Sequence, residues 1–178
     1  MSGHNKWSKI KRQKAVEDSK KSKIFSKLSK KITIAAREGG GDPEMNPALS
    51  MLINKAKEAN MPKDNISAAV KKGIGASKDV NNIVEMVYEG YGPFGVALVI
   101  KTVTDNKNRT VSGIRKVLEE SEGSLGTLGS ASYVFDTDMT PTFEVPLDKE
   151  SCSKIRGLID KLEGLEDVID IYANFKQA

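Results

Sequence analysis

The hydrophobic residues near the start of the chain recur at the 3.6-residue period of an α-helix. Between Glu17 and Glu38 they return at steps of three and four and fill one arc of about 120° on a helical projection. The residues on this arc are Ile24, Phe25, Leu28, Ile32, Ala35 and Ala36. The sequence GGGDP follows, and its glycines and proline favour a helix end. We therefore expect the first helix to span about Glu17 to Glu38.

Two shorter helical patterns come next. Asn46 followed by Pro47 combines a capping side chain with a residue suited to the first helical position, which predicts a helix that runs to Asn60. The sequence NMPKDNISAAVKKG predicts a third helix from about Pro62 to Gly73. The residues expected to face inward are Leu49, Leu52, Ile53, Ala56, Ile66, Ala69 and Val70. Residues 1–75 are thus predicted to form a basic N-terminal arm and a three-helix domain.

The periodicity changes after the polar connector IGASKDVNN. Two strands are predicted, joined through GYGPFG, whose glycines and proline suit a tight reversal. Further strands and two helices should follow. The expected strands are 83–91, 96–104, 131–135, 142–145 and a last one from Val168, and the expected helices are 108–121 and one that begins at Asp148. The predicted fold class is multi-domain α and α+β: the three-helix domain, then residues 76–178 as an α+β two-layer sandwich with a mainly antiparallel sheet.

Charge is divided unequally between the two halves. The 178 residues carry a net charge of +4, but residues 1–75 hold 17 Lys or Arg against 7 Asp or Glu. Residues 76–178 hold 11 against 17, so the halves carry +10 and −6. On the first predicted helix the cations lie opposite the apolar arc, where they add nothing to packing. This division indicates that the N-terminal half binds a polyanion.

The candidate nucleic-acid contacts are the cations of this half, together with an aromatic residue that could stack on a base. They are Lys6, Trp7, Lys9, Lys11, Arg12, Lys14, Lys20, Lys23, Lys27, Lys30, Lys31, Arg37, Lys71 and Lys72. The first residues are expected to form a mobile arm. Three other interpretations compete with nucleic-acid binding: a solubilising surface, a docking module for an acidic protein, and a membrane-surface helix. The last is the weaker one, because the apolar arc is needed to pack the domain.

A further candidate lies in TDNKNRT, residues 104–110. Asn, Asp and Thr between a strand and a helix are suited to capping backbone amides, which is a structural role. Arg109 beside the helix N-terminus is also a candidate phosphate ligand.

The residues needed for catalysis are scarce. His4 is the only histidine and Cys152 the only cysteine. Cys152 lies three residues before Ile155 on the apolar stripe of its helix, which predicts a buried core thiol. No second His or Cys accompanies His4 to complete a metal site, and no nucleophile and base are evident. We expect no enzymatic activity, no metal and no cofactor.

The sequence also bears on location. The longest aliphatic run, Val96 to Ile100, is far shorter than the roughly 20 residues of a membrane-spanning helix. The N-terminal residues lack the apolar core of a secretory signal and the Arg-rich, acid-poor composition of a transit peptide. A single cysteine fits a reducing compartment. We expect a cytoplasmic protein without a membrane partner.

Several segments together resemble one protein family. They are GHNKWSKIKRQKA, KIFSKL, AAREGGGDPEMNPALSMLINKAKEANMPKDNI, KKG, YEGYGP, TDNKNRT and IYANF. They are similar to the YebC/PmpR family, which includes the mitochondrial translational activator of cytochrome oxidase subunit I. The resemblance implies a helical N-terminal domain, α/β domains behind it, a cytoplasmic location and a role in gene expression without catalysis.

The family is described both as transcriptional regulators that bind promoter DNA and as translation factors that act at the ribosome. A Lys-dominated surface contacts phosphates rather than base edges, which favours weak sequence specificity and structured RNA. The usual description of the bacterial members favours DNA. DNA, ribosomal RNA and the ribosome are therefore all candidate partners.

The chain departs from the family pattern at two places. Phe94 stands where the family more often has a small residue or Asn. Family members are also usually longer, with a further acidic α/β domain after the segment that corresponds to ASYVF, whereas DTDMTPT joins the flanks directly here. The chain therefore resembles a two-domain variant.

Overall fold

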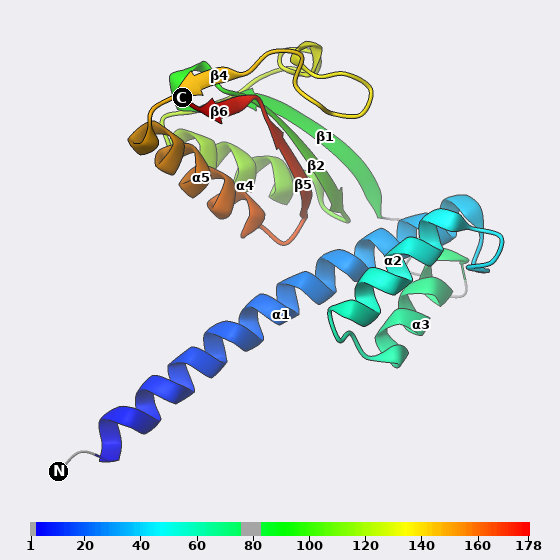
Figure 1. The fold of residues 1–178 in the computed structure, drawn as a ribbon. Helices are drawn as coiled ribbons and strands as arrows, with labels where there is room; N and C mark the ends of the chain where they lie inside the picture. Colours follow the sequence, from blue (N-terminus) through cyan, green and yellow to red (C-terminus); the bar gives the residue numbers. More distant parts are fainter. Residues whose placement is uncertain (1–2, 76–82) are drawn as a thin grey trace. The chain divides into compact units, whose positions relative to one another are not determined.

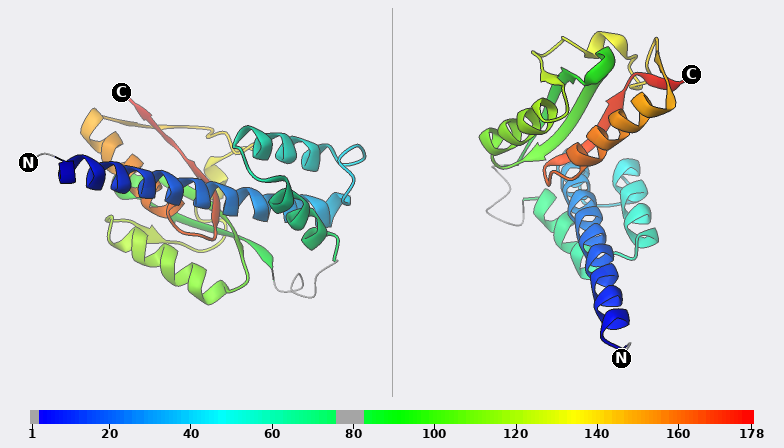
Figure 2. Two further views of the ribbon diagram at one scale, coloured as in Figure 1. Left: turned by 90° about the horizontal axis from the view of Figure 1, so that it is seen from below. Right: turned by 90° about the vertical axis from the view of Figure 1, so that its left-hand side faces the viewer.

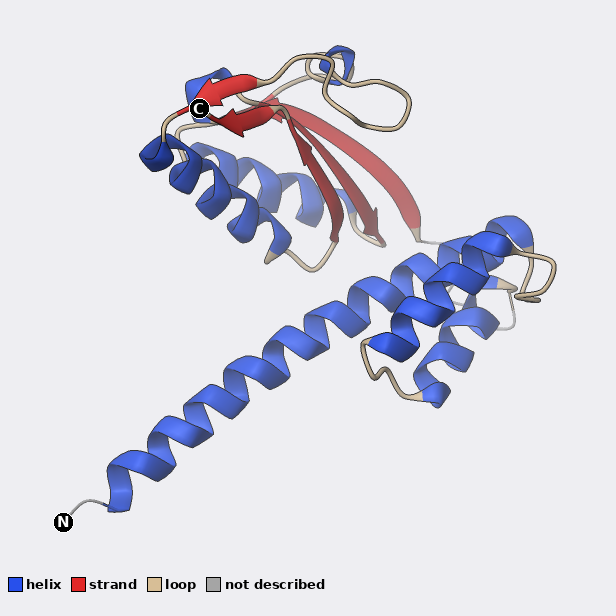
Figure 3. Ribbon diagram, viewed as in Figure 1, coloured by secondary structure: helices blue, strands red, loops and turns tan. Residues whose placement is uncertain are grey.

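The chain divides into two compact units, Met1–Asn81 and Asn82–Ala178. The structure, a computed structural model, describes the backbone of residues 3–75 and 83–178, and within these ranges the side chains from Lys14 onward. The first unit is helical and the second contains helices and strands (Figures 1 and 3).

Three helices form the N-terminal unit: α1 (Gly3–Gly39), α2 (Pro47–Glu58) and α3 (Lys63–Gly73). Their shared core is built from Ile32, Ala35, Ala36, Leu49, Ala56, Met61, Ile66 and Ala69. The expected start of the first helix near Glu17 was wrong, because α1 begins at Gly3. Between these two residues the sequence has no Gly or Pro, and it contains four Lys together with Arg12, Gln13 and Ala15, all of which favour helix. The mobility expected of the first residues stays a prediction.

Two buried polar side chains join α1 to its neighbours. The Asn46 Nδ2 group donates to the carbonyl oxygens of Ala35 (2.8 Å) and Gly40 (2.9 Å), and its Oδ1 accepts from the Leu49 amide (3.1 Å). One amide side chain therefore satisfies both the end of α1 and the start of α2. The Thr33 hydroxyl contacts the carbonyl oxygen of Ala69 at 3.1 Å, which ties α1 to α3.

Gly73 permits the close approach of α3 to α1. A Cβ atom there would overlap the Thr33 carbonyl oxygen and lie 2.6 Å from the Ala36 Cβ. Gly73→Ala is therefore expected to lower the free energy of unfolding by about 1–3 kcal/mol through overpacking. Urea denaturation followed by far-ultraviolet circular dichroism measures the loss. Gly157→Ala, in a helix of the second unit where a Cβ would meet nothing within 4 Å, is the matched control and should stabilise by about 0.5–1 kcal/mol. Equal effects at both positions would contradict this account.

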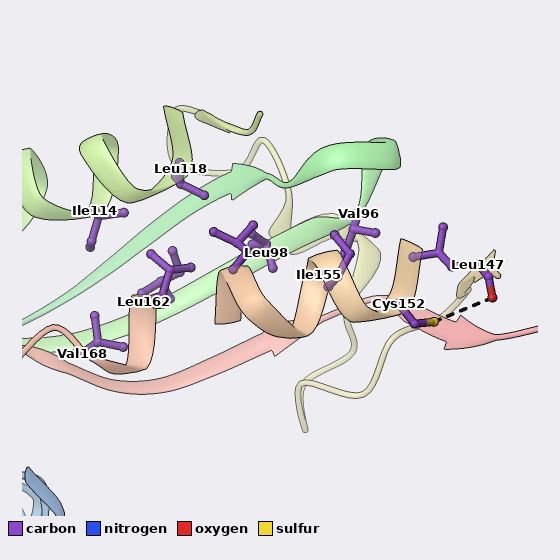
Figure 4. Close-up of a cluster of buried hydrophobic side chains, with 11 residues drawn as sticks. Val96, Leu98, Ile114, Leu118, Leu147, Cys152, Ile155, Leu162 and Val168 are labelled. Atoms are coloured by element: carbon purple, nitrogen blue, oxygen red, sulfur yellow. Dashed lines mark hydrogen bonds between the residues drawn. The ribbon is translucent and has the colours of Figure 1, made fainter. Parts of the chain in front are cut away.

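The second unit is a two-layer α+β sandwich, as predicted. Its sheet contains, in spatial order, β3 (Ser124–Leu125), β1 (Val84–Tyr91), β2 (Ala97–Thr104) and β5 (Val168–Ala173), and every pairing is antiparallel. Helices α4 (Lys107–Glu119) and α5 (Lys149–Glu163) lie on one face of this sheet (Figures 1 and 2). The core between the layers includes Val96, Leu98, Ile100, Ile114, Leu118, Ile155, Leu158 and Leu162 (Figure 4).

The opposite face of β2 is covered as well. Ala97 and Val99 pack against Ala131, Val134 and Phe135, which belong to the segment between β3 and β4. Because β2 is buried on both faces, it has an unbroken apolar run instead of an alternating pattern.

The strand predicted at 131–135 was wrong. Residues Ser132–Val134 form a 3-10 helix, η3, and Phe135 makes only an isolated bridge to Pro141. The physical reason is Glu89, a buried residue of β1. Its carboxylate accepts hydrogen bonds from the backbone amides of Gly129 (2.8 Å), Ala131 (2.7 Å) and Ser132 (2.7 Å). Amides that bind this carboxylate cannot also serve a strand ladder.

The C-terminal strands also differ from expectation. The short strand expected at 142–145 is β4 (Val145–Leu147), which pairs in parallel with β6 (Phe175–Gln177) in a separate two-stranded sheet. β5 ends at Ala173, and the next residue, Asn174, accepts a hydrogen bond from the Ala97 amide through its Oδ1 at 2.7 Å. The Asn174 amide still donates to the Ala97 carbonyl oxygen at 3.3 Å, but the Asn174 carbonyl oxygen accepts from the Val145 amide of β4 at 2.7 Å. The side chain therefore serves as acceptor for the Ala97 amide, and the chain then continues as β6.

The reversal between β1 and β2 explains the unusual position of Phe94. A short 3-10 turn, η2 (Pro93–Gly95), places Phe94 at φ 63° and ψ 15°, in the left-handed region. Gly and Asn adopt this conformation at lower cost than a bulky residue. The small residue or Asn that the resemblance implies at this position would therefore suit the backbone better than Phe94 does.

Candidate nucleic-acid interface

Helix α1 has a packed part and an unpacked part. Its 37 residues give a length of about 55 Å. Among the side chains of α1 that the structure describes, only those from Phe25 onward contribute to the core of the N-terminal unit. All residues from Lys14 to Ile24 are exposed, and in Figure 1 the helix projects beyond α2 and α3.

The unpacked part of α1 carries four exposed lysines: Lys14, Lys20, Lys21 and Lys23. Among the residues with described side chains, no ion pair joins any of the four to a carboxylate. Two acidic residues, Glu17 and Asp18, are also exposed in this stretch. The unpacked part therefore presents a net positive surface that makes no contribution to the core.

Lys21 was absent from the residues proposed from the sequence. It lies four positions before Phe25 and seven before Leu28, and a helix places residues at these spacings on the same face, which is the apolar arc. Because the core ends at Phe25, Lys21 is exposed like its neighbours. The signal that could have located it is the sequence before Phe25, which has few apolar residues.

The other predicted cations of α1 are in a different setting. Lys27, Lys30 and Lys31 are half-buried, and Arg37 is exposed. Each of these four residues has at least one interaction partner in the protein. At the end of α3, Lys71 is exposed and Lys72 is half-buried.

Five predicted contacts lie at the start of α1: Lys6, Trp7, Lys9, Lys11 and Arg12. Their backbone belongs to the helix, but their side chains fall outside the described residues. They remain predictions, as does stacking by Trp7.

Arg109 is held by carboxylates of its own unit. Its Nη2 lies 2.9 Å from Oδ1 of Asp167 and 2.9 Å from Oδ1 of Asp105, and its Nε donates to Oδ2 of Asp167 at 3.2 Å. Hydrogen bonding to Asp167 and the charge of that residue, followed by Asp105, raise the pKa of Arg109. The Thr110 hydroxyl also contacts Asp167 Oδ2, at 2.8 Å. This cluster anchors the start of α4 to the loop before β5.

The N-terminus of α4 is already capped. Asn106 Oδ1 accepts a hydrogen bond from the Arg109 amide at 3.1 Å, as the capping interpretation of TDNKNRT predicted. With its cap and guanidinium both in use, this end of α4 fits a structural role. Phosphate binding by Arg109 remains a prediction, and the proposal below does not depend on it.

Three other kinds of feature could bear on function in the described residues: the thiol of Cys152, a metal site and a membrane-spanning helix. Cys152 is 1% exposed and packs in the core of the second unit, which confirms the prediction of a core thiol (Figure 4). Within residues whose side chains are described, no group of three or more potential ligands could hold a metal ion. Among the described helices, none is long and apolar enough to cross a membrane.

Comparison with known proteins establishes the family. Residues 5–76 match the model of the TACO1/YebC protein N-terminal domain, and residues 83–138 match that of the TACO1/YebC second and third domain. The chain therefore belongs to the TACO1/YebC family, as the motifs indicated.

Its relatives are named as regulators. A protein of Borrelia garinii named "probable transcriptional regulatory protein" is 60% identical over 135 residues, which is 76% of this chain but 55% of that relative. The chain thus matches about half the length of that protein. A Borrelia duttonii protein of the same description is 39% identical over 238 residues, covering 99% of this chain and 98% of the relative. Since this chain has 178 residues, at least 60 positions of that alignment have no counterpart here.

A solved structure confirms the fold. The crystal structure of a conserved hypothetical protein from Aquifex aeolicus has a TM-score of 0.80 and 30% sequence identity, and the match covers 88% of this chain and 90% of that one.

Proposed function

We propose that this protein is a non-enzymatic regulator of gene expression that binds DNA through the N-terminal unit, as a transcriptional regulator. The observation that carries the proposal is the run of exposed lysines on the unpacked part of α1. Like charges on one helix repel each other and contribute nothing to the core, so they are most simply explained by an external polyanion. The net charge of +10 on residues 1–75, against −6 on residues 76–178, supports the same assignment.

The chemistry of these residues also limits the kind of recognition. A lysine ammonium is a compact charge that contacts phosphate oxygens, whereas reading of bases favours bidentate side chains in a groove. Binding should therefore depend weakly on DNA sequence. The acidic second unit is expected to stay clear of the phosphates and to serve as a spacer or docking surface.

The dependence of affinity on salt tests this proposal. If about six phosphates are neutralised, the logarithm of the association constant should fall with the logarithm of salt concentration at a slope near −5 for duplex DNA. Fluorescence anisotropy titrations of a labelled duplex between about 0.05 and 0.2 M salt measure the slope, which corresponds to a loss of about 10³-fold across that range. An affinity independent of salt, or no binding to any nucleic acid, would refute the proposal.

A translation factor that binds ribosomal RNA is the second candidate function. The predominance of lysine on the exposed part of α1 favours it, because such a surface can follow any phosphate backbone. Sedimentation of a lysate through a sucrose gradient separates the two candidates. Migration with ribosomes that is abolished in high salt would favour RNA, and a free protein that still binds duplex DNA would favour the transcriptional role. Nuclease treatment of the same lysate identifies an acidic protein partner, since such a complex survives it.

A further inference from the structure

The unpacked part of α1, residues 14–24, has no buried face. All eleven of these residues are exposed, including the two large apolar ones, Val16 at 55% and Ile24 at 48%. Figure 2 shows the same segment projecting from α2 and α3 in two further views. Within the described part of the N-terminal unit no other element covers this stretch, so its helical form depends on its own sequence.

That sequence supports a helix only weakly. Most helical stability in proteins comes from tertiary packing, and residues 14–24 lack such packing although they continue into the packed part of the same helix. Lys20 and Lys23 are three positions apart and repel each other across the helix surface, and the attraction between Glu17 and Lys21, four positions apart, offsets only part of this repulsion between lysines. Ser19 and Ser22 have lower helix propensity than Ala and gain nothing from burial. A ligand that neutralises the lysines removes one of these costs.

We propose that residues 14–24 form a phosphate-contacting surface of the protein, and that nucleic-acid binding stabilises their helix. The inference rests on the proposed function and adds to it the segment that binds and the way in which binding and folding are coupled. The ligand is a phosphate backbone. DNA and RNA duplexes both supply such a backbone, so the experiments use one duplex of each as separate probes. Each is about 24 base pairs long, which is longer than the roughly 16 base pairs that a double-stranded-RNA-binding domain spans.

Hydrogen exchange of the full chain detects the coupling directly. In the free protein, amides of residues 18–24 should exchange much faster than those of the packed part of α1. Saturation with the DNA or the RNA duplex should slow them by about tenfold or more. Protection that is already equal to that of the packed part, and unchanged by either duplex, would overturn the inference. A change with one duplex alone would identify that nucleic acid as the source of the backbone.

A pair of variants separates coupled folding from simple contact. Ser19→Ala with Ser22→Ala favours the helix, and Ser19→Gly with Ser22→Gly disfavours it, while neither pair alters charge or a buried contact. When binding requires the helix, affinity is reduced by the fraction of molecules that lack it. The Ala pair should therefore bind the duplex more tightly than the Gly pair, by up to about 25-fold.

Ser153, an exposed residue of α5, provides the control. Ser153→Ala and Ser153→Gly change helix propensity in the same way on a packed helix of the second unit, and should bind the duplex equally well. If the Ser19 and Ser22 variants also bind equally, with the expected dependence on salt, the coupling is refuted while the proposed function stands. If no variant and no wild-type protein binds either duplex, both the inference and the proposed function are refuted.

Discussion

Replacement of Lys14, Lys20, Lys21 and Lys23 by glutamine in one variant is expected to weaken DNA binding by about three orders of magnitude near 0.1 M salt. Each phosphate that the variant no longer neutralises removes about 0.9 from the slope of log affinity against log salt, so the slope should become shallower by about 3 to 4. Glutamine keeps similar helix propensity, and all four side chains are exposed. The thermal midpoint should therefore hardly change. Anisotropy titrations at several salt concentrations, combined with thermal unfolding, measure both quantities.

A control of equal charge is present on the acidic unit. Lys107, Lys149, Arg156 and Lys161 are exposed there, and none of them has an ion pair among the residues with described side chains. Their joint replacement by glutamine changes the net charge by the same amount and should leave the affinity within a few-fold of wild type. Equal losses in both variants would mean that total charge, rather than the surface of α1, determines binding.

Glu89→Gln is expected to destabilise the second unit by about 3 kcal/mol at neutral pH. The Glu89 side chain is buried, and its two carboxylate oxygens accept three backbone amides. A carboxamide presents only one acceptor oxygen, so its NH₂ group faces an amide donor and leaves that donor unsatisfied. Loss of a charge-assisted hydrogen bond costs about 1.5–3 kcal/mol, and an unsatisfied buried donor costs about 1–3 kcal/mol. Near-ultraviolet circular dichroism reports this unfolding, because all four tyrosines lie in the second unit.

The effect should depend on pH in a defined direction. Burial of Glu89 opposes ionisation, but the hydrogen bonds from Gly129, Ala131 and Ser132 outweigh it and lower its pKa. Because the folded state has the lower pKa, the stabilisation is complete above the unfolded value of about 4.3 and is lost as pH falls through the folded pKa. Wild type and variant should therefore differ most at pH 7 and converge at low pH. Glu163→Gln, at an exposed site, should show neither effect. A constant difference across pH would refute the role of the charge.

The helices of this protein could be located from the sequence because their signals are local. The cap at Asn46 and the apolar residues of α2 follow directly from neighbouring positions, and the structure confirms both. The stripe of α5, from Cys152 through Leu162, is likewise buried as predicted. The antiparallel hairpin of β1 and β2 was also recovered, since Gly92, Pro93 and Gly95 mark the reversal.

The elements that were missed depend on distant partners. The segment 131–135 has the composition of a strand, but Glu89, some 40 positions earlier, binds its amides and a 3-10 turn results. The pairing of β4 with β6 joins Val145 to Phe175, which no local period can reveal. A side chain that accepts hydrogen bonds from backbone amides far along the sequence can override the local strand propensity of that segment.

The sequence by itself determined the order of the helices, the family, and the separation of positive from negative charge between the two halves, because periodicity, motifs and charge are all carried by neighbouring residues. Tertiary structure decided which cations of α1 are exposed, because the core ends at Phe25 and leaves Lys21 uncovered. It also decided that Arg109 meets Asp167, a carboxylate 58 positions away. Burial and ion pairing are set by groups that only the folded chain brings together.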